Sequence, residues 1–186
     1  MATRRGILLH TCCAVCLEAV FPAIEALGFS ARPFFYNPNI HPFREFEKRL
    51  RAVEVACDVH KVSLIADREY GLATYLERIA PAGDIRCLEC YALRMDRAAR
   101  EAVSAGIEAF TTTLLVSGHQ KHDDVARAGR EAAEKHGIEF FYRDWRELMS
   151  SGIEAARKRS LYRQQYCGCI WSEYERFGPK KDEGRG

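Results

Sequence analysis

Short apolar segments alternate with amphipathic segments along most of this chain, and this alternation constrains the fold more than any other feature. Apolar runs of strand length predict about five strands, at residues 6–10, 32–36, 62–66, 108–115 and 138–142. Apolar residues at helical spacing predict helices at residues 16–27, 43–57, 70–80, 87–104, 122–136 and 152–165. Strands that alternate with helices build a parallel sheet with helices on both faces. We therefore predict a three-layer α/β fold with a mainly parallel sheet.

The length of 186 residues suits one domain with a single core. We expect this domain to span residues 1–177, and the charged, glycine-rich segment 178–186 to be a flexible tail. Pro22 lies inside the first predicted helix and predicts a kink or a late helix start. No apolar run approaches the roughly 18–20 residues that span a bilayer, and the run after Arg5 is too short for a signal peptide. The sequence thus predicts a cytoplasmic protein without a membrane partner.

Eight cysteines are the unusual feature of the composition, and seven of them fall into three clusters. The clusters are HTCCAVC with Cys12, Cys13 and Cys16, RCLECYALR with Cys87 and Cys90, and YCGC with Cys167 and Cys169. Because thiols stay reduced in the cytosol, a disulfide framework is not expected, and metal or redox chemistry explains the clusters better. Cys57 stands alone on a predicted amphipathic helix and is expected to be a buried core residue.

The spacing within each cluster suits metal binding or redox chemistry. Cys12 and Cys13 follow the first strand directly, and ligands of open parallel sheets bind at the carboxyl ends of strands. Cys16 completes a C-x-x-C pair at a helix start, where the helix dipole favours a thiolate. Cys87 and Cys90 lie three residues apart on one helical face. A disulfide within C-x-C would be strained and easily reduced, so the last pair is either redox-active or binds a metal.

These spacings leave three kinds of centre open. Thiolates from separate segments bind an iron–sulfur cluster, two C-x-x-C pairs also suit a structural zinc ion, and a thiol–disulfide exchange site is the third alternative. The formal net charge of +2 argues against a protein that binds nucleic acid by bulk electrostatics, although it permits a local basic surface. The chain lacks the P-loop and G-x-G-x-x-G motifs, so neither ATP nor a dinucleotide is expected as a ligand.

Six segments, in their order along the chain, resemble one known family, the QueH-type epoxyqueuosine reductases. They are HTCCAVC, FFYNPNIHPFREFEKR, RCLECYALRM, FTTTLLVSGHQ, YRDW and LYRQQYCGC. The resemblance extends from about Gly6 to Ser172 and implies a Rossmann-like fold of the nucleotide-hydrolase (HUP) and PP-loop kind. It also implies the two-electron reduction of epoxyqueuosine, at the wobble position of tRNA, to queuosine. The alternative is a zinc-binding, nucleic-acid-binding module without redox activity.

The resemblance implies that a [4Fe-4S] cluster is held by four cysteines: Cys12, Cys13, Cys87 and Cys90. Cys167 and Cys169 match the terminal C-x-C, which the resemblance assigns either to a catalytic, redox-active disulfide or to a second mononuclear metal, iron or zinc. Cys16 occupies a position where relatives carry Cys or an acidic ligand, and it is a candidate for the second metal. Val15 stands where many relatives carry proline, which affects the local rigidity of the chain.

The implied partners are tRNA that contains epoxyqueuosine, recognised at its anticodon loop, and an electron donor that the sequence does not identify. Four basic residues form either a candidate RNA surface or a solvated helix face: Arg157, Lys158, Arg159 and Arg163. Phe34 and Phe35 are expected in the core, whereas the position of Tyr36 stays open.

Other polar residues have two interpretations each. Asn37, Asn39 and His41 either line a substrate pocket or build a turn. Asp144 and His10 are candidate proton donors to the departing oxygen. Asp144 equally fits the N-cap of a following helix, and His10 equally fits a hydrogen-bonded core histidine, so neither is assigned to catalysis.

Overall fold

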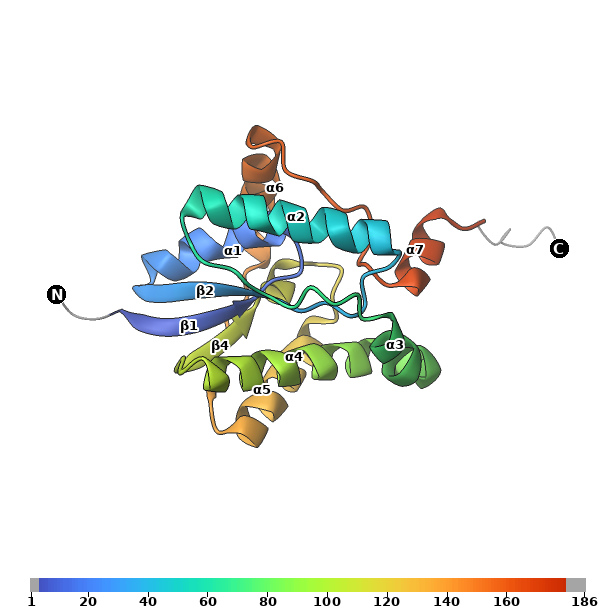
Figure 1. The fold of residues 1–186 in the computed structure, drawn as a ribbon, viewed down its shortest axis with the longest axis horizontal. Helices are drawn as coiled ribbons and strands as arrows, with labels where there is room; N and C mark the ends of the chain where they lie inside the picture. Colours follow the sequence, from blue (N-terminus) through green and yellow to red (C-terminus); the bar gives the residue numbers. More distant parts are fainter. Residues whose placement is uncertain (1–3, 180–186) are drawn as a thin grey trace.

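Five parallel strands form the central sheet of this computed structural model, which describes residues 4–179 (Figure 1). The strands lie in the order β3-β2-β1-β4-β5. Their bounds are β1 Arg5–His10, β2 Phe29–Phe35, β3 Ile65–Ala66, β4 Ala109–Thr112 and β5 Glu139–Phe140. Central β1 pairs with β2 and β4, so that Leu9 lies opposite Pro33 on one side and Thr111 on the other. Because helices cover both of its faces, Ile7, Leu8 and Leu9 are fully buried.

Helices form a layer on each face of the sheet (Figure 1). Helices α1, α2 and α6 pack on one face, and α4 and α5 pack on the other. The bounds are α1 Ala14–Ala26, α2 Phe43–His60, α3 Leu72–Thr74, α4 Arg86–Ser104, α5 His122–His136, α6 Met149–Lys158 and α7 Ile170–Phe177. The predicted three-layer α/β fold with a parallel sheet is therefore confirmed.

Several predicted boundaries were wrong for local reasons. Helix α1 starts at Ala14, earlier than predicted, and continues through Pro22. The strand predicted at 108–115 ends at Thr112, and a 3-10 turn follows at Thr113–Val116. The segment predicted as one helix at 70–80 consists of α3, a π-helical turn at Tyr75–Ile79 and 3-10 turns at Ala80–Ile85.

The largest difference lies in the C-terminal region. The predicted helix at 152–165 ends at Lys158, because Ser160 adopts a left-handed conformation with a φ of 53°. Residues 159–169 then form an irregular loop, and α7, which the sequence pattern did not predict, follows. Most of the predicted tail at 178–186 lies outside the described residues. Within residues 4–179, no helix is both long and apolar enough to cross a membrane.

The topology brings the predicted motifs to one edge of the sheet. Because all strands are parallel, the loops after β1, β2 and β4 leave the sheet at their carboxyl ends. The backbone N–H of Thr11 donates to the carbonyl of Phe34 at 2.8 Å, which joins the first two of these loops. HTCCAVC, the NPNIHP loop and the turn after β4 therefore lie close together.

Candidate metal centre

Three cysteine sulfurs converge where β1 ends and α1 begins. The Sγ atoms of Cys13 and Cys16 are 2.8 Å apart, and those of Cys12 and Cys13 are 3.9 Å apart. In the described part of the chain, this is the one group of three or more potential metal-ligand residues whose ligand atoms all lie within 4.8 Å of one another. Cys13 also caps α1, because its sulfur accepts the backbone N–H of Cys16. Strand end and helix start thus fix the three sulfurs together.

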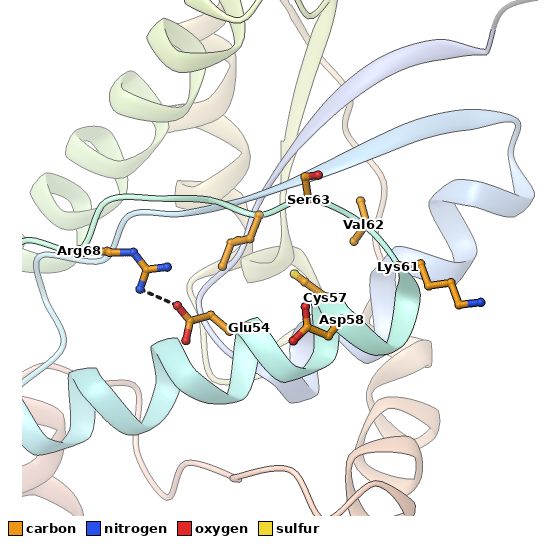
Figure 2. A pocket seen from close by; sticks show the side chains of 8 residues that line it. Glu54, Cys57, Asp58, Lys61, Val62, Ser63 and Arg68 are labelled. Carbon is orange, nitrogen blue, oxygen red and sulfur yellow. Dashed lines mark ion pairs between the residues drawn. The ribbon is translucent and has the colours of Figure 1, made fainter.

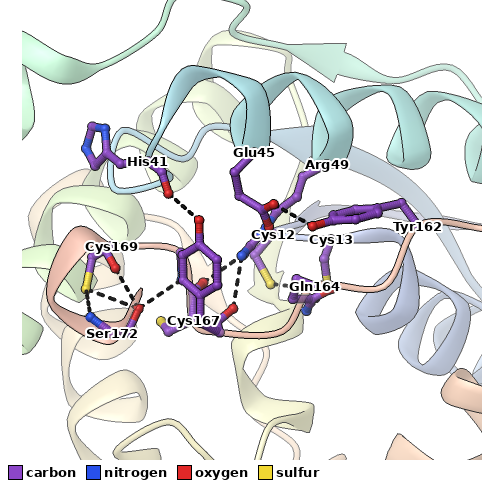
Figure 3. Close-up of polar contacts among 12 residues, drawn as sticks. Cys12, Cys13, His41, Glu45, Arg49, Tyr162, Gln164, Cys167, Cys169 and Ser172 are labelled. Carbon is purple, nitrogen blue, oxygen red and sulfur yellow. Dashed lines mark hydrogen bonds and ion pairs between the residues drawn. The ribbon is translucent and has the colours of Figure 1, made fainter. Parts of the chain in front are cut away.

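Polar neighbours complete the surroundings of these sulfurs. The Thr113 hydroxyl lies 3.5 Å from the sulfur of Cys12 and accepts the Cys12 backbone N–H at 3.2 Å. The Gln164 side-chain amide donates to the sulfur of Cys13 at 2.8 Å (Figure 3). These contacts come from the turn after β4 and from the loop before α7, so residues distant in sequence meet at one group of thiols.

The three thiols favour one shared negative charge. Hydrogen bonds with Cys13 and Cys16 hold the pKa of Cys12 well below its ordinary value. Burial raises the pKa of Cys13, and hydrogen bonds with Cys12 and Cys13 raise the pKa of Cys16. A thiophilic cation would bind by displacing the remaining protons, so an all-sulfur set of this kind suits iron or zinc.

Cys87 and Cys90 lie in the first turn and a half of α4, as predicted. Cys90 is buried in a small apolar cluster with Tyr75 and Ile79, and Cys169 packs against the same cluster. Burial raises the pKa of Cys90 to about 12, and negative charge at Cys167, Cys169 and Cys87 adds to this rise although Arg94 opposes it. The second and third cysteine clusters therefore meet at the apolar cluster around Tyr75 and Ile79.

The C-x-C loop is held by hydrogen bonds to its backbone (Figure 3). The guanidinium of buried Arg49 donates to the carbonyls of Cys167 and Tyr166, at 2.8 and 2.9 Å. The backbone N–H of His41 donates to the carbonyl of Gly168 at 2.8 Å. Gly168 has a φ of 136°, and a Cβ there would lie 3.1 Å from both Arg49 Nη1 and Ile40. This loop conformation therefore requires glycine between the two cysteines.

The two sulfurs of this loop have separate partners. Gln120 donates to exposed Cys167 at 3.4 Å, and its amide oxygen accepts the Tyr91 hydroxyl at 3.0 Å. Cys169 caps α7, because its sulfur accepts the backbone N–H of Ser172. Both sulfurs are free thiols, as are the other six cysteines.

Neither candidate proton donor has the surroundings of an acid. His10 is fully buried, with its ring nitrogens 2.8 Å from the Thr112 hydroxyl and 3.1 Å from the Tyr36 carbonyl. Burial and the charge of Arg94 lower its pKa to about 4, so it is neutral. Asp144 accepts the backbone N–H and the guanidinium of Arg146, which holds its pKa well below the ordinary value. The geometry favours the core interpretation for His10. Asp144 precedes Trp145, the N-cap of the short 3-10 turn at Arg146–Leu148, so the predicted N-cap is displaced by one residue and Asp144 pairs with Arg146 instead.

The polar loop after β2 builds structure. Asn37, Asn39 and His41 are buried. Asn37 donates to the carbonyl of Thr11, and His41 contacts the Tyr70 hydroxyl at 2.6 Å. Asn37 and His41 therefore help to build this turn, whereas the buried side-chain oxygen of Asn39 has no hydrogen-bond partner.

The aromatic and basic segments divide between core and surface. Phe34 and Phe35 are in the core, as predicted, whereas Tyr36 is half-buried and stacks parallel to Phe34. The four basic residues near the end of α6 are all exposed, but Lys158 pairs with Glu154 and Arg159 pairs with Glu18.

Cys57 is a buried core residue, as predicted. It is 2% exposed and belongs to the main hydrophobic cluster. Its side chain helps to line a surface pocket of about 560 Å³, where Glu54 and Arg68 form an ion pair (Figure 2). Burial raises the pKa of Cys57 to about 12, so this pocket contains no reactive thiolate.

Four polar residues of the site were not predicted from the sequence: Arg49, Arg94, Gln120 and Gln164. Each lies inside one of the quoted motif segments. Arg94 had a further signal, because it falls on the buried face of a helix, between Tyr91 and Ala98. A charged residue among apolar ones on such a face indicates a specific partner.

Comparisons with known proteins identify the family. The sequence matches the family described as Epoxyqueuosine reductase QueH over residues 7–175. It is 39% identical to the epoxyqueuosine reductase QueH of Dehalococcoides mccartyi, over 92% of this chain and 94% of the relative. It is 32% identical to the enzyme of that name from Thermotoga maritima, over 91% of each chain.

Among solved structures, the U34-tRNA thiolase NcsA from Methanococcus maripaludis with its [4Fe-4S] cluster gives a TM-score of 0.49 at 14% identity, over 87% of this chain and 58% of that one. The family match and the curated relatives both extend over nearly the whole chain. The chain therefore belongs to the QueH family of epoxyqueuosine reductases, which are oxidoreductases of tRNA modification.

Proposed function

We propose that this protein reduces epoxyqueuosine in the anticodon loop of tRNA with electrons from a [4Fe-4S] cluster. In this reaction both C–O bonds of the epoxide break, a C=C bond forms, and the oxygen leaves as water after taking up two electrons and two protons. Family membership supports the reaction, and the convergence of buried thiols at the end of β1 supports the cofactor. That convergence is the single structural observation on which the cofactor assignment depends.

The donor atoms fit such a cluster. Cys12, Cys13 and Cys16 form an all-sulfur set, and thiolates are the ligands that iron–sulfur clusters take. We propose Cys12, Cys13, Cys87 and Cys90 as its four ligands. When bound, such a cluster supplies electrons one at a time.

Cys167 and Cys169 remain the proposed redox dithiol or the ligands of a second iron or zinc. Their support is location, since Cys167 is exposed at the surface while Cys169 packs beside Cys90. The contact of 2.8 Å between Cys16 and Cys13 favours a place for Cys16 at the first group of sulfurs rather than beside the C-x-C loop.

The protein's own polar groups hold the sulfurs and stabilise their charge. The amide donors of Gln164 and Gln120 point at Cys13 and Cys167. A hydrogen bond to a thiolate favours its charged form and fixes its direction. These donors therefore prepare the sulfurs before the substrate arrives.

The tRNA surface that we propose lies at the end of α6 and in the loop that follows it. All four basic residues are exposed, but Lys158 and Arg159 pair with carboxylates, whereas Arg157 and Arg163 form no ion pair among residues 4–179. Replacing both arginines should weaken tRNA binding whatever the tRNA sequence. It should also lower the slope of log Kd against the logarithm of the salt concentration by roughly 1 to 2. Binding measured at several salt concentrations tests this, and an unchanged slope would reject the surface.

The function is tested by turnover of tRNA that contains epoxyqueuosine. Purified protein with a chemical reductant should convert the modified base to queuosine, detected by mass spectrometry of the digested tRNA. The Cys13→Ser variant should not do so. Conversion by protein that contains zinc but no iron or sulfide would refute the cluster. In that case, the dithiol of Cys167 and Cys169 would be the remaining candidate for the electron source.

A further inference from the structure

Arg94 on α4 is fully buried, with 1% of its surface exposed, yet it has few partners. Its Nε–H donates to the carbonyl of Cys90 at 3.2 Å, while Nη2 has no hydrogen-bond partner. Within residues 4–179, the arginines that pair with a carboxylate do not include Arg94. A buried guanidinium without a counter-charge is strongly unfavourable, so a negative partner is expected.

Arg49 is a buried arginine of the same molecule whose charge is paired. It is equally buried, but it pairs with Glu45 at 2.7 Å and donates to two carbonyls. Both side chains lie close to cysteines. The difference is that Arg49 pairs with a carboxylate, whereas Arg94 forms no ion pair with any carboxylate in the described part of the chain.

Contacts connect Arg94 to the second and third cysteine clusters. Besides its hydrogen bond to the carbonyl of Cys90, the guanidinium lies 5.7 Å from the ring centroid of Tyr91. The Tyr91 hydroxyl donates to Gln120, whose amide donates to the sulfur of Cys167. Arg94 therefore belongs to one network of contacts with Cys90 and Cys167.

We infer that Arg94 is the counter-cation of the thiolate–metal centre, a positioning residue that stabilises the negative charge the centre gains on reduction. This inference rests on the proposed function, because the added charge is an electron for the epoxide. It assigns Arg94 no contact with the substrate. The guanidinium instead raises the reduction potential of whatever centre the surrounding thiolates hold.

The test compares three variants of the anaerobically purified holoprotein. Arg94→Met removes the charge and keeps a long, helix-compatible side chain. Arg94→Lys keeps the charge. Arg127→Met is the matched control, since it removes one positive charge from an exposed position on α5, where the guanidinium pairs with Asp124. The readout is the midpoint potential of the bound cluster, with iron content measured on each sample.

Arg94→Met should weaken the electron affinity of the centre about tenfold, which lowers a one-electron potential by about 59 mV. Arg94→Lys and Arg127→Met should each remain within about twofold of wild type in the same equilibrium. An unchanged potential in Arg94→Met protein with a full iron complement would overturn the inference. So would an equal shift in the Arg127→Met control.

A second readout separates this inference from the cofactor assignment. In metal-free protein at fixed neutral pH, loss of the guanidinium should slow alkylation of exposed Cys167 by iodoacetamide about fivefold, because the thiolate loses its counter-charge. The alkylation test remains valid if the wild-type protein contains no cluster, or if the Arg94→Met variant fails to take up iron. Equal alkylation rates in the two proteins would refute the role of Arg94, whatever the metal content.

Discussion

The two cysteine segments at opposite ends of the chain, residues 11–16 and 159–169, are held in place by different interactions. The first lies between β1 and α1, so a buried strand and a helix N-terminus fix its backbone. The second contains no helix or strand, and its backbone is held by Arg49 and His41. Arg49 is 118 residues away in the chain from the carbonyl of Cys167 that it binds.

This difference shows that residues close in sequence hold the first segment, whereas contacts with distant parts of the chain hold the second. Folding of β1 and α1 alone brings Cys12, Cys13 and Cys16 together. The C-x-C loop adopts its position only when α2 and the NPNIHP loop are already packed. We therefore expect damage to the first segment to abolish the chemistry, and damage to the second to act through the fold.

The largest effect is expected at the first segment. Cys13→Ser should lower turnover at least about 100-fold, because a sulfur ligand and the cap of α1 change together. Iron content and turnover of modified tRNA measure the effect. Cys57→Ser is the control: it alters the core but should retain iron and most of the activity. Equal loss in both variants would show that stability, not ligation, is responsible.

Arg49→Met should destabilise the fold by about 3–5 kcal/mol, since it leaves the buried carboxylate of Glu45 without its cation. Urea unfolding of the purified variant measures the loss. Adding Glu45→Gln should recover part of the stability, because the unpaired charge is removed as well. A loss below about 1 kcal/mol would mean that Arg49 does not hold the C-x-C loop as described.

Gly168→Ala should cost about 1–3 kcal/mol and displace the C-x-C loop, because its φ of 136° and the nearby Arg49 both exclude a side chain. Gly137→Ala is the matched control, as Gly137 also has a positive φ but no atom within 4 Å of an added Cβ. The control should cost about 1 kcal/mol and leave turnover unchanged. Similar turnover in both variants would contradict the steric argument.

The smallest effects are expected from the two amide donors. Gln164→Leu and Gln120→Leu should each reduce turnover about tenfold and change stability by less than about 1.5 kcal/mol. If Gln164 and Gln120 act on separate sulfurs, the activation free energies that the two single variants lose should add in the double variant. Strong non-additivity would show that Cys13 and Cys167 belong to one coupled centre.

The fold was largely predictable because its signals are local. Apolar β1 and the amphipathic pattern of α4 identified the parallel α/β fold, and the place of Cys12 at a strand end followed. The N-terminal cysteines could therefore be placed from the sequence, whereas the prediction that they share a cluster with Cys87 and Cys90 stays a prediction.

The rest depends on contacts that a linear pattern does not contain. Residues 159–165 continue a helical pattern, but the left-handed Ser160 ends the helix and burial of Leu161 redirects the chain. Helix α7 begins at a cysteine cap rather than at Ser, Thr, Asp or Asn, and its aromatic residues are exposed, so the usual start and core signals were missing. The roles of Arg49 and Arg94 arise only from tertiary packing.

The central claim is that the converging thiols hold an iron–sulfur cluster. The most direct test is iron, sulfide and zinc content, with a visible spectrum, of protein purified without oxygen. About four iron and four sulfide per chain, with up to one further iron or zinc, is the result that we predict. One zinc without sulfide would contradict the cluster assignment.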